Sequence, residues 1–244
     1  MKRCYKGLTD PGLVRAVNQD DYYTDDPNGR FFIVADGMGG HAGGQEASKI
    51  ATQVICDYFE KHWDSATPSN DLLEQAVLQA NQALLADQND HPERADMGTT
   101  VVVLLFRENQ YWYTHVGDSR FYLLRNGKLQ QITEDHTWVA RALRLGDITK
   151  EQSRIHPWRH VLSQCLGRKD LPKVEVHPLD VKPGDRLLLC SDGLSGEVSD
   201  ESIASYLRSY SDCAEAAEVL VEAARDNGGA DNITVIVVTI EEDS

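Results

Sequence analysis

The fold is decided by the stretch Phe31-Phe32-Ile33-Val34-Ala35-Asp36-Gly37-Met38, in which five consecutive apolar residues end at a carboxylate and a glycine. The run Phe31–Ala35 has no polar position, so it predicts a strand that is buried on both faces. The run Val101–Phe106 is apolar throughout as well. Strands of this kind indicate that two sheets pack against each other beneath covering helices.

Strand-like runs continue on both sides of this stretch, and tight turns join several of them. The other runs are Asp21–Asp25, Thr99–Phe106, Tyr111–Val116, Arg120–Arg125, Lys128–Ile132, Lys173–His177, Arg186–Cys190 and Asn232–Ile240. The turn Asp26-Pro27-Asn28-Gly29 links the first two strands. Asn126-Gly127 is a strong hairpin signal, because both residues of that turn need a positive φ. Hairpins predict antiparallel sheets.

Helix-like periodicity comes in blocks and does not alternate with the strands. The predicted helices are Gly44 to about Trp63, Asn70 to about Asp87 behind a Ser69-Asn70-Asp71 cap, Asp200–Arg208 and Asp212–Arg225. This order predicts an α+β fold in which an antiparallel sandwich has helices packed outside it. A length of 244 residues suits one large domain, so we expect residues 1–244 to form a single one.

Composition and charge narrow the class of protein. The chain is 41% hydrophobic and has a net charge of −15, which disfavours binding to the phosphates of nucleic acid. It contains no run of roughly 18 to 20 apolar residues and no apolar stretch behind its first charges, so we expect neither a membrane segment nor a secretory signal. Five scattered cysteines suggest reduced thiols and a cytoplasmic protein. Nothing resembling a coiled coil is present, so we expect a monomer.

Four aspartates stand at the ends of predicted strands, each with glycine beside or near it. They are Asp36, Asp118 in Gly117-Asp118-Ser119, Asp192 in Ser191-Asp192-Gly193, and Asp231 after Gly228-Gly229. One Asp-Gly pair is most simply a turn, but four of them on apolar strands are not explained by turns alone. Carboxylates gathered at strand ends repel one another unless cations neutralise them. Hard oxygen ligands without a His or Cys cluster favour Mg²⁺ or Mn²⁺ over zinc.

The sequence motifs of several nucleotide-binding, phosphatase and metal-binding proteins are either missing or stand in an unsuitable context. Gly37-x-Gly39-x-x-Ala42 formally matches the dinucleotide fingerprint, but Asp36 would then face a pyrophosphate and the remaining strands form hairpins. No cysteine has an arginine six residues later, as a cysteine phosphatase requires. A P-loop and a twelve-residue EF-hand loop are also missing from the sequence.

Taken in order, the motifs resemble those of the PP2C-type (PPM) metal-dependent Ser/Thr protein phosphatases over nearly the whole chain. The matching segments are Arg15–Asp20, Asp36–Gly44, Gly98-Thr99-Thr100, Val116–Arg120, Gly184-Asp185-Arg186, Ser191-Asp192-Gly193 and Gly229–Asn232. The chain looks most like the compact bacterial members, particularly the small cyanobacterial enzymes. One of those acts on the phosphorylated nitrogen-signalling PII protein, which is therefore one candidate substrate.

This resemblance implies two stacked antiparallel β-sheets flanked by α-helices, an α-β-β-α sandwich, and a set of metal ligands. Asp36 is expected to bridge two Mg²⁺ or Mn²⁺ ions, with the Gly37 carbonyl completing the second site. Asp192 and Asp231 are expected to hold the first ion. Asp118, together with Asp192, is expected to form a weaker third site.

The resemblance also implies a mechanism. A water that bridges two cations becomes a hydroxide nucleophile near neutral pH and attacks a phosphorylated Ser or Thr. Asp20 is expected to support a metal-bound water, and Arg15 is expected to clamp the phosphate. His41 is the candidate general acid, with an orienting or helix-starting role as the alternative. Its match is imperfect, since Met38-Gly39-Gly40 separates it from Asp36-Gly37.

Residues 137–169 reverse the local charge of this acidic chain, with seven Lys or Arg against two acids. The segment matches the variable flap of the family, and we interpret it as a substrate-docking lid that uses Arg141 and Arg144. A solvated surface element is the alternative. For the whole chain, the alternative to an active phosphatase is a catalytically silent module that binds phosphoproteins. The presence of Asp36, Asp192, Asp231 and Arg15 favours activity.

Overall fold

The computed structural model describes residues 1–40 and 43–242. The strands are β1 (Lys2–Asp10), β2 (Asp20–Thr24), β3 (Phe31–Met38), β4 (Gly98–Thr99), β5 (Val101–Arg107), β6 (Gln110–Val116), β7 (Arg120–Arg125), β8 (Lys128–Gln131), β9 (Val176–Pro178), β10 (Arg186–Cys190) and β11 (Ile233–Glu241). The helices are α1 (Gly43–His62), α2 (Ser69–Asp90), α3 (Trp138–Leu145), α4 (Lys150–Ile155), α5 (Asp192–Ser195), α6 (Asp200–Ser209) and α7 (Cys213–Asp226), with a 3₁₀ turn, η1, at Pro92–Arg94.

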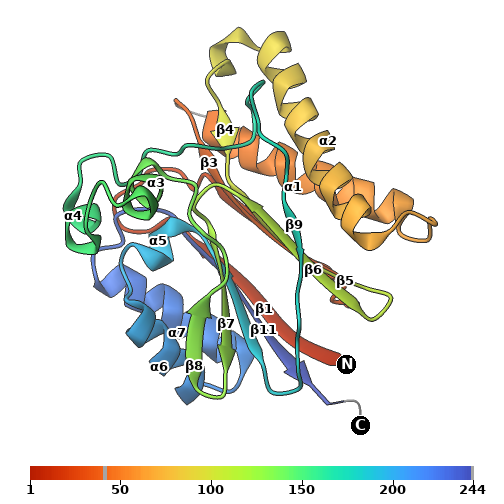
Figure 1. Cartoon of the computed structure of the whole chain (residues 1–244), viewed down its shortest axis with the longest axis vertical. Helices are drawn as coiled ribbons and strands as arrows, with labels where there is room; N and C mark the ends of the chain where they lie inside the picture. Colours follow the sequence, from red (N-terminus) through yellow and green to blue (C-terminus); the bar gives the residue numbers. More distant parts are fainter. Residues whose placement is uncertain (41–42, 243–244) are drawn as a thin grey trace.

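The strands form two sheets, and the pairings described between them are antiparallel. One sheet has the order β1-β11-β10-β7-β8. The other has the order β2-β3-β5-β6-β9, and β4 pairs with β3 at its end. Figure 1 shows α1 and α2 covering one sheet and α6 and α7 covering the other. The predicted α-β-β-α sandwich is therefore confirmed.

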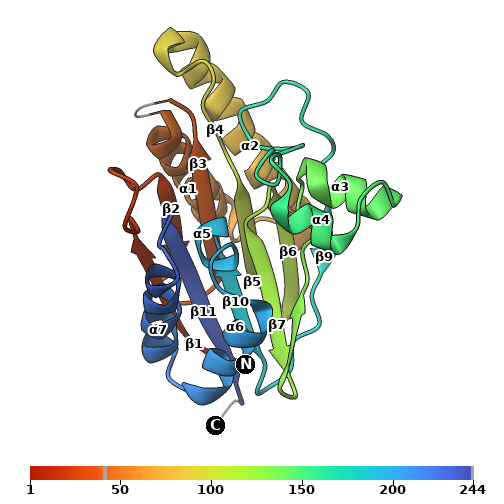
Figure 2. The same cartoon turned by 90° about the vertical axis from the view of Figure 1, so that its left-hand side faces the viewer.

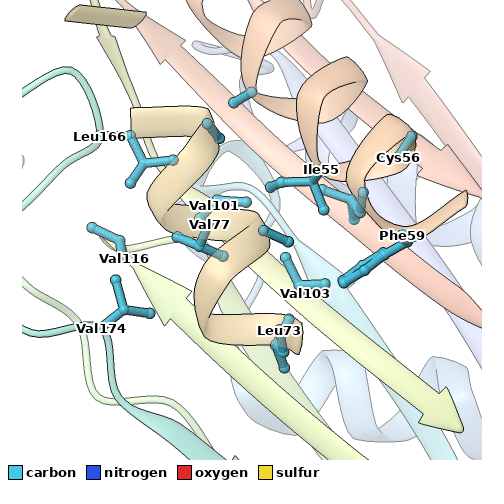
Figure 3. Close-up of a cluster of buried hydrophobic side chains, with 14 of the residues drawn as sticks. Ile55, Cys56, Phe59, Leu73, Val77, Val101, Val103, Val116, Leu166 and Val174 are labelled. Atoms are coloured by element: carbon cyan, nitrogen blue, oxygen red, sulfur yellow. The ribbon is translucent and has the colours of Figure 1, made fainter. Parts of the chain in front are cut away.

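The apolar strands bury both faces by alternation, as the sequence predicted. Phe31 and Ile33 point to a cluster beneath α1 and α2, which Figure 3 shows around Leu73, Val77 and Ile55. Phe32 and Val34, which alternate with Phe31 and Ile33 along β3, point into the layer between the two sheets. A third cluster lies between α6, α7 and the other sheet. Three layers of buried side chains therefore hold four layers of backbone together.

Strand β1 is the strand that the sequence did not reveal, and the short helices α3, α4 and α5 were not predicted either. It pairs with β11 along its whole length, from Lys2 opposite Glu241 to Asp10 opposite Ile233. Its residues are mostly half-buried or exposed, and only Gly7 is buried. A Cβ at Gly7 would lie 2.3 Å from Cε2 of Tyr22, so the absence of a side chain lets β1 approach the neighbouring sheet. An edge strand of this composition has no strong apolar alternation to detect.

The structure confirms one predicted turn and contradicts one predicted helix cap. Asn126 and Gly127 have φ values of 51° and 75°, which confirms the hairpin between β7 and β8. The predicted Ser69-Asn70-Asp71 cap is wrong. Helix α2 begins at Ser69 with Pro68 as the N-cap residue, and proline has no side-chain oxygen that could accept a cap bond. Ser69 is buried, and its Oγ has no partner among the described residues.

Segment 137–169 leaves the sandwich and returns to it beside β4. Thr137 pairs with Leu162 and Thr99 pairs with Leu166, so the segment is closed at its base. Between these points lie α3 and α4, each capped by a threonine side chain. Figure 1 places α3, α4 and α5 at one end of the sheets and both chain termini near the other end. No helix within residues 1–40 and 43–242 is long and apolar enough to cross a membrane.

Candidate metal centre

The aspartates predicted from the sequence lie at the same end of the sandwich. Asp36 is near the end of β3, and Asp20, which opens β2, is its antiparallel partner. Asp118 follows β6, Asp192 follows β10 and opens α5, and Asp231 precedes β11. Neighbouring strands in an antiparallel sheet run in opposite directions. The ends of some strands and the starts of others therefore meet at the same end of the sandwich. We call these five residues the carboxylate cluster.

Asp36 is fixed by its backbone. Its N–H donates to Thr100 Oγ1 at 3.0 Å, and its C=O accepts from the Thr100 N–H at 2.8 Å and from Thr99 Oγ1 at 2.9 Å. Burial, followed by the charges of the other four aspartates in the cluster, raises the pKa of Asp36 well above its ordinary value. The Gly98-Thr99-Thr100 motif therefore positions the central carboxylate.

Gly37 is required by the packing of α1 against β3. A Cβ on Gly37 would lie 1.9 Å from the carbonyl oxygen of Gly44, which is closer than any real contact. The Gly37 N–H donates to the Gln19 C=O at 3.1 Å, which ties β3 to the residue just before β2. Glycine thus brings the start of α1 against the end of the strand that carries Asp36.

Asp20 is 8% exposed, and its hydrogen bonds are one-sided. Its Oδ2 accepts from Ser191 Oγ and from Thr234 Oγ1, both at 2.7 Å. Its Oδ1 is buried and has no hydrogen-bond partner among the residues that the structure describes. Burial is the main cause that raises the pKa of Asp20 to about 7, and the nearby charge of Asp192 adds to it. A buried carboxylate oxygen without a donor indicates that a positive charge or a water belongs beside it.

Asp118 is also buried, and its pKa is raised to about 7 by burial and then by the charge of Asp192. Asp192 is held differently, because the Nδ1 atom of His160 lies 3.5 Å from its Oδ2. Hydrogen bonding to Asp192 raises the pKa of His160. His160 belongs to the segment that the sequence predicted to be a lid, but the sequence assigned it no role.

Arg15 and Asp231 form the outer edge of the cluster. The Nη2 atom of Arg15 donates to Asp231 Oδ2 at 2.7 Å, and the two side chains are 52% and 37% exposed. That bond, with the weaker fields of Asp192 and Asp36, raises the pKa of Arg15. The guanidinium is therefore both close to the carboxylates and open to solvent.

Asn232 organises the loop that carries Arg15, a role that the sequence did not reveal. Its Oδ1 accepts from the Gln19 N–H at 2.8 Å, and its Nδ2 donates to the carbonyls of Pro11 at 3.0 Å and Val17 at 3.1 Å. Asn232 is 3% exposed. One buried side-chain amide therefore forms hydrogen bonds to backbone groups on both sides of Arg15. The signal was present in the Asp231-Asn232 motif, but the motif does not say what Asn232 holds.

The described residues do not already form a closed coordination shell. Within 1–40 and 43–242, no three His, Cys, Asp or Glu side chains gather closely enough to hold a metal ion. Two carboxylates instead have basic side chains beside them, Asp231 the guanidinium of Arg15 and Asp192 the imidazole of His160. The cluster still fits hard divalent cations, because its donors are carboxylate oxygens, three pKa values are raised, and Asp20 has an orphaned oxygen.

The remaining predicted residues make no described contact with this cluster or lie outside the described residues. Arg144 pairs with Glu134 at 3.1 Å, and both side chains are mostly exposed. Arg141 is exposed on α3. Neither makes a described contact with the carboxylates. His41 lies outside the described residues.

Two residues close to the cluster in the chain have structural roles. Arg120 pairs with Asp135, with Nη2 to Oδ2 at 2.7 Å, and so serves structure. Cys190 is fully buried in β10, and burial raises the pKa of its thiol to about 12. A thiol in that state is inert towards oxidation, although it lies two residues from Asp192.

A family model described as protein phosphatase 2C matches residues 14–226. The chain belongs to the protein phosphatase 2C family. The Ser/Thr protein phosphatase PstP of Mycobacterium tuberculosis is 41% identical over 97% of this chain. This chain spans only 45% of the length of that relative. The Ser/Thr phosphatase stp of Listeria monocytogenes is 35% identical, with 94% of this chain and 93% of the relative covered.

Solved structures of the 2C family confirm the fold. The catalytic domain of the phosphatase PstP, in complex with two manganese ions, superposes with a TM-score of 0.86 and 37% identity. The match covers 98% of this chain and 99% of that one. The resemblance to bacterial 2C phosphatases that the motifs indicated is therefore confirmed.

Proposed function

We propose that this chain hydrolyses phosphoserine and phosphothreonine in proteins with the help of two divalent cations held by the carboxylate cluster. The reaction class follows from the family, whose bacterial relatives are Ser/Thr protein phosphatases. The observation that supports an active enzyme is the cluster itself, in which Asp20, Asp36 and Asp118 have raised pKa values and the charges of the other four aspartates raise the pKa of Asp36. A silent binding module has no need of such a cluster.

Each ligand has a proposed place. Asp36 and the Gly37 carbonyl would be the ligands at the central position. Asp192 and Asp231 would complete the coordination of the first ion, and Asp118 with Asp192 would hold a weaker third ion. Either Mg²⁺ or Mn²⁺ suits these oxygen donors. When bound, the cations lower the pKa of a shared water so that its oxygen can attack phosphorus. Asp20, with one free oxygen, can accept a hydrogen bond from such a water.

Arg15 is proposed to bind the phosphate. Its guanidinium lies 2.7 Å from Asp231 at the exposed edge of the cluster, and its planar fork matches two phosphate oxygens. As the water oxygen joins phosphorus, the bond to the Ser or Thr oxygen breaks and that oxygen takes a proton. The prediction that His41 supplies the proton stays a prediction.

Segment 137–169 is proposed to act as a lid. It is closed at its base by the pairs Thr137–Leu162 and Thr99–Leu166. Thr99 also donates to the backbone of Asp36, so the base of the segment touches the strand that carries the central carboxylate. The cationic Arg141 and Arg144 lie on the exposed helix α3, where they can attract a phosphorylated surface. The phosphorylated PII protein stays a predicted substrate.

The test is phosphate release from a phosphothreonine peptide with Mn²⁺ and then with EDTA. We expect release with Mn²⁺, none with EDTA, and a loss of at least ~100-fold in Asp192→Asn, because metal catalysis contributes several kcal/mol. Asp170→Asn is the matched control, since Asp170 is an exposed aspartate that pairs only with Arg168 among the ion pairs described. Folded wild-type protein that releases no phosphate with Mn²⁺ would reject the enzyme and leave the phosphoprotein-binding module as the alternative.

A further inference from the structure

Large hydrophobic side chains are exposed on two short segments beside the carboxylate cluster. Of the nine such side chains in the described part of the chain, eight lie on these segments and only Tyr210 lies elsewhere. The Arg15 rim consists of Leu13, Val14 and Val17. The Trp rim consists of Trp138, Leu143, Leu145, Trp158 and Val161. Single exposed apolar residues are ordinary on a protein surface, whereas this concentration marks an interaction site.

The Arg15 rim is fixed directly beside the phosphate-binding arginine. Leu13 donates its N–H to the Gly229 C=O at 2.8 Å, which anchors the loop to the turn before Asp231. Val14 is 70% exposed and Val17 is 44% exposed. Nothing in the described structure covers these side chains. A group bound to Arg15 therefore has apolar surface next to it.

The Trp rim begins on the other side of the cluster. His160 contacts Asp192 at 3.5 Å, and Val161 follows it in the chain. The Trp138 N–H donates to the Val161 C=O at 2.8 Å, and the rings of Trp138 and Trp158 meet edge to face at 5.2 Å. His156 stacks on Trp138 with ring centroids 4.8 Å apart. These rings support one another, and Trp158 is still 54% exposed.

The two rims therefore bracket the cluster. In Figure 2 the loop between β1 and β2 lies on one side of α5, and α3 and α4 lie on the other side. A phosphate held by Arg15 would sit between the rims, so the residues before and after the phosphorylated one would meet apolar surface on both sides. Rigid aromatic side chains next to a polar centre are typical of binding hot spots.

We propose that the two rims bind the phosphoprotein substrate through large apolar side chains that flank its phosphorylated residue. The occupant is a phosphorylated protein segment, because the rims are continuous with the proposed phosphate site at Arg15 and Asp231. An anionic membrane fits less well, since the exposed apolar residues surround carboxylates and the chain carries a net charge of −15. This inference rests on the proposed phosphatase activity and adds its substrate class.

The test compares two phosphothreonine peptides that differ only in the residues on each side of the phosphothreonine, Leu in one and Gln in the other. With Mn²⁺, we expect wild-type kcat/KM to be ~10-fold higher for the Leu peptide, the scale at which apolar pockets discriminate. Trp158→Ser and Val14→Ser should each bring the ratio within ~3-fold of unity. Tyr210→Ser is the matched control and should keep the full ratio, because Tyr210 is exposed but lies on neither rim.

The outcomes separate this inference from the proposed function. Metal-dependent release from both peptides at equal kcat/KM would overturn the apolar-flank inference and leave the phosphatase intact. A ratio that survives in Trp158→Ser and Val14→Ser would also overturn it. Binding of wild type to phosphatidylglycerol vesicles that Trp158→Ser abolishes, with no peptide preference, would assign the rims to a membrane. No release from either peptide would reject the phosphatase itself.

Discussion

At Gly193 the missing side chain is what lets α5 approach β11. A Cβ there would lie 2.0 Å from the carbonyl oxygen of Asn232, and backbone cannot yield as the end of a flexible side chain can. We expect Gly193→Ala to lower the free energy of unfolding by about 2 kcal/mol, because overpacking a tight contact typically costs this much. For a chain of this size the melting temperature should fall by about 4 to 8 °C. Urea unfolding and calorimetry measure both.

Gly40→Ala is the control for that change. Among residues 1–40 and 43–242, nothing lies within 4 Å of a Cβ at Gly40, so Gly40→Ala removes the same glycine entropy without a described clash. Its free energy of unfolding should stay within about 0.5 kcal/mol of wild type. If Gly193→Ala were as stable as Gly40→Ala, the close approach of α5 to β11 would not be a constraint on the fold.

At the scale of elements, the loop between β1 and β2 is held by Asn232 from the far end of the chain. Asn232→Ala removes three hydrogen bonds, one from the Gln19 N–H and one each to the carbonyls of Pro11 and Val17. We expect the loop to open, trypsin to cleave after Arg15 faster, and kcat/KM on a phosphopeptide to fall by at least ~10-fold, because a displaced positioning group costs about that much.

Asn89→Ala supplies the control for this loop. Asn89 is an exposed residue of α2 that lies far from Arg15 in the chain. Its tryptic pattern and its kcat/KM should match wild type. Unchanged cleavage after Arg15 in Asn232→Ala, with lowered global stability alone, would show that Asn232 serves the core and not the loop.

Elements with a strong periodic signal could be predicted from the sequence, and the contacts between distant elements could not. Phe31–Ala35 and the Asn126-Gly127 turn carry their structure locally, so both were found. The polar edge strand β1 lacks such a signal. The sequence could predict that the aspartates lie close together, because each ends or precedes a buried strand. The hold of Asn232 on Gln19, and the contact of His160 with Asp192, depend on packing across 213 and 32 residues, and no local pattern encodes them.

At the scale of the whole molecule, negative charge is concentrated where burial makes it most costly. The chain carries a net charge of −15, and three aspartates of the cluster, Asp20, Asp36 and Asp118, have raised pKa values at one end of the sandwich. Cations bound at this end of the sandwich would neutralise these charges and so would raise the stability of the folded chain. The acidity of the site therefore couples metal binding, protonation and folding.

This coupling predicts that the free energy of unfolding depends on pH. Comparing wild type with a variant at Asp20 measures the part that this residue contributes. The pKa of Asp20 is about 7 in the folded chain and about 3.9 in an unfolded one, so the folded state holds the proton more tightly. The stability this proton contributes is complete below pH ~4 and is lost as pH rises through ~7. In EDTA, Asp20→Asn should therefore gain about 2 kcal/mol over wild type between pH 5 and pH 8. Urea unfolding of both proteins at each pH measures the difference.

Manganese should reverse that order, because a bound cation stabilises the ionised carboxylate cluster and the neutral amide of the Asp20→Asn variant contributes no charge to it. Wild type should then gain stability over Asp20→Asn at pH 8, by an amount that grows with the concentration of Mn²⁺. Asp64→Asn, at an exposed position between α1 and α2, should show neither effect. A difference between wild type and Asp20→Asn that is the same at pH 5 and pH 8 in EDTA would mean that Asp20 is already ionised in the metal-free fold. The carboxylate cluster would then be stabilised by Arg15 and His160 alone, and metal binding would release no proton from Asp20.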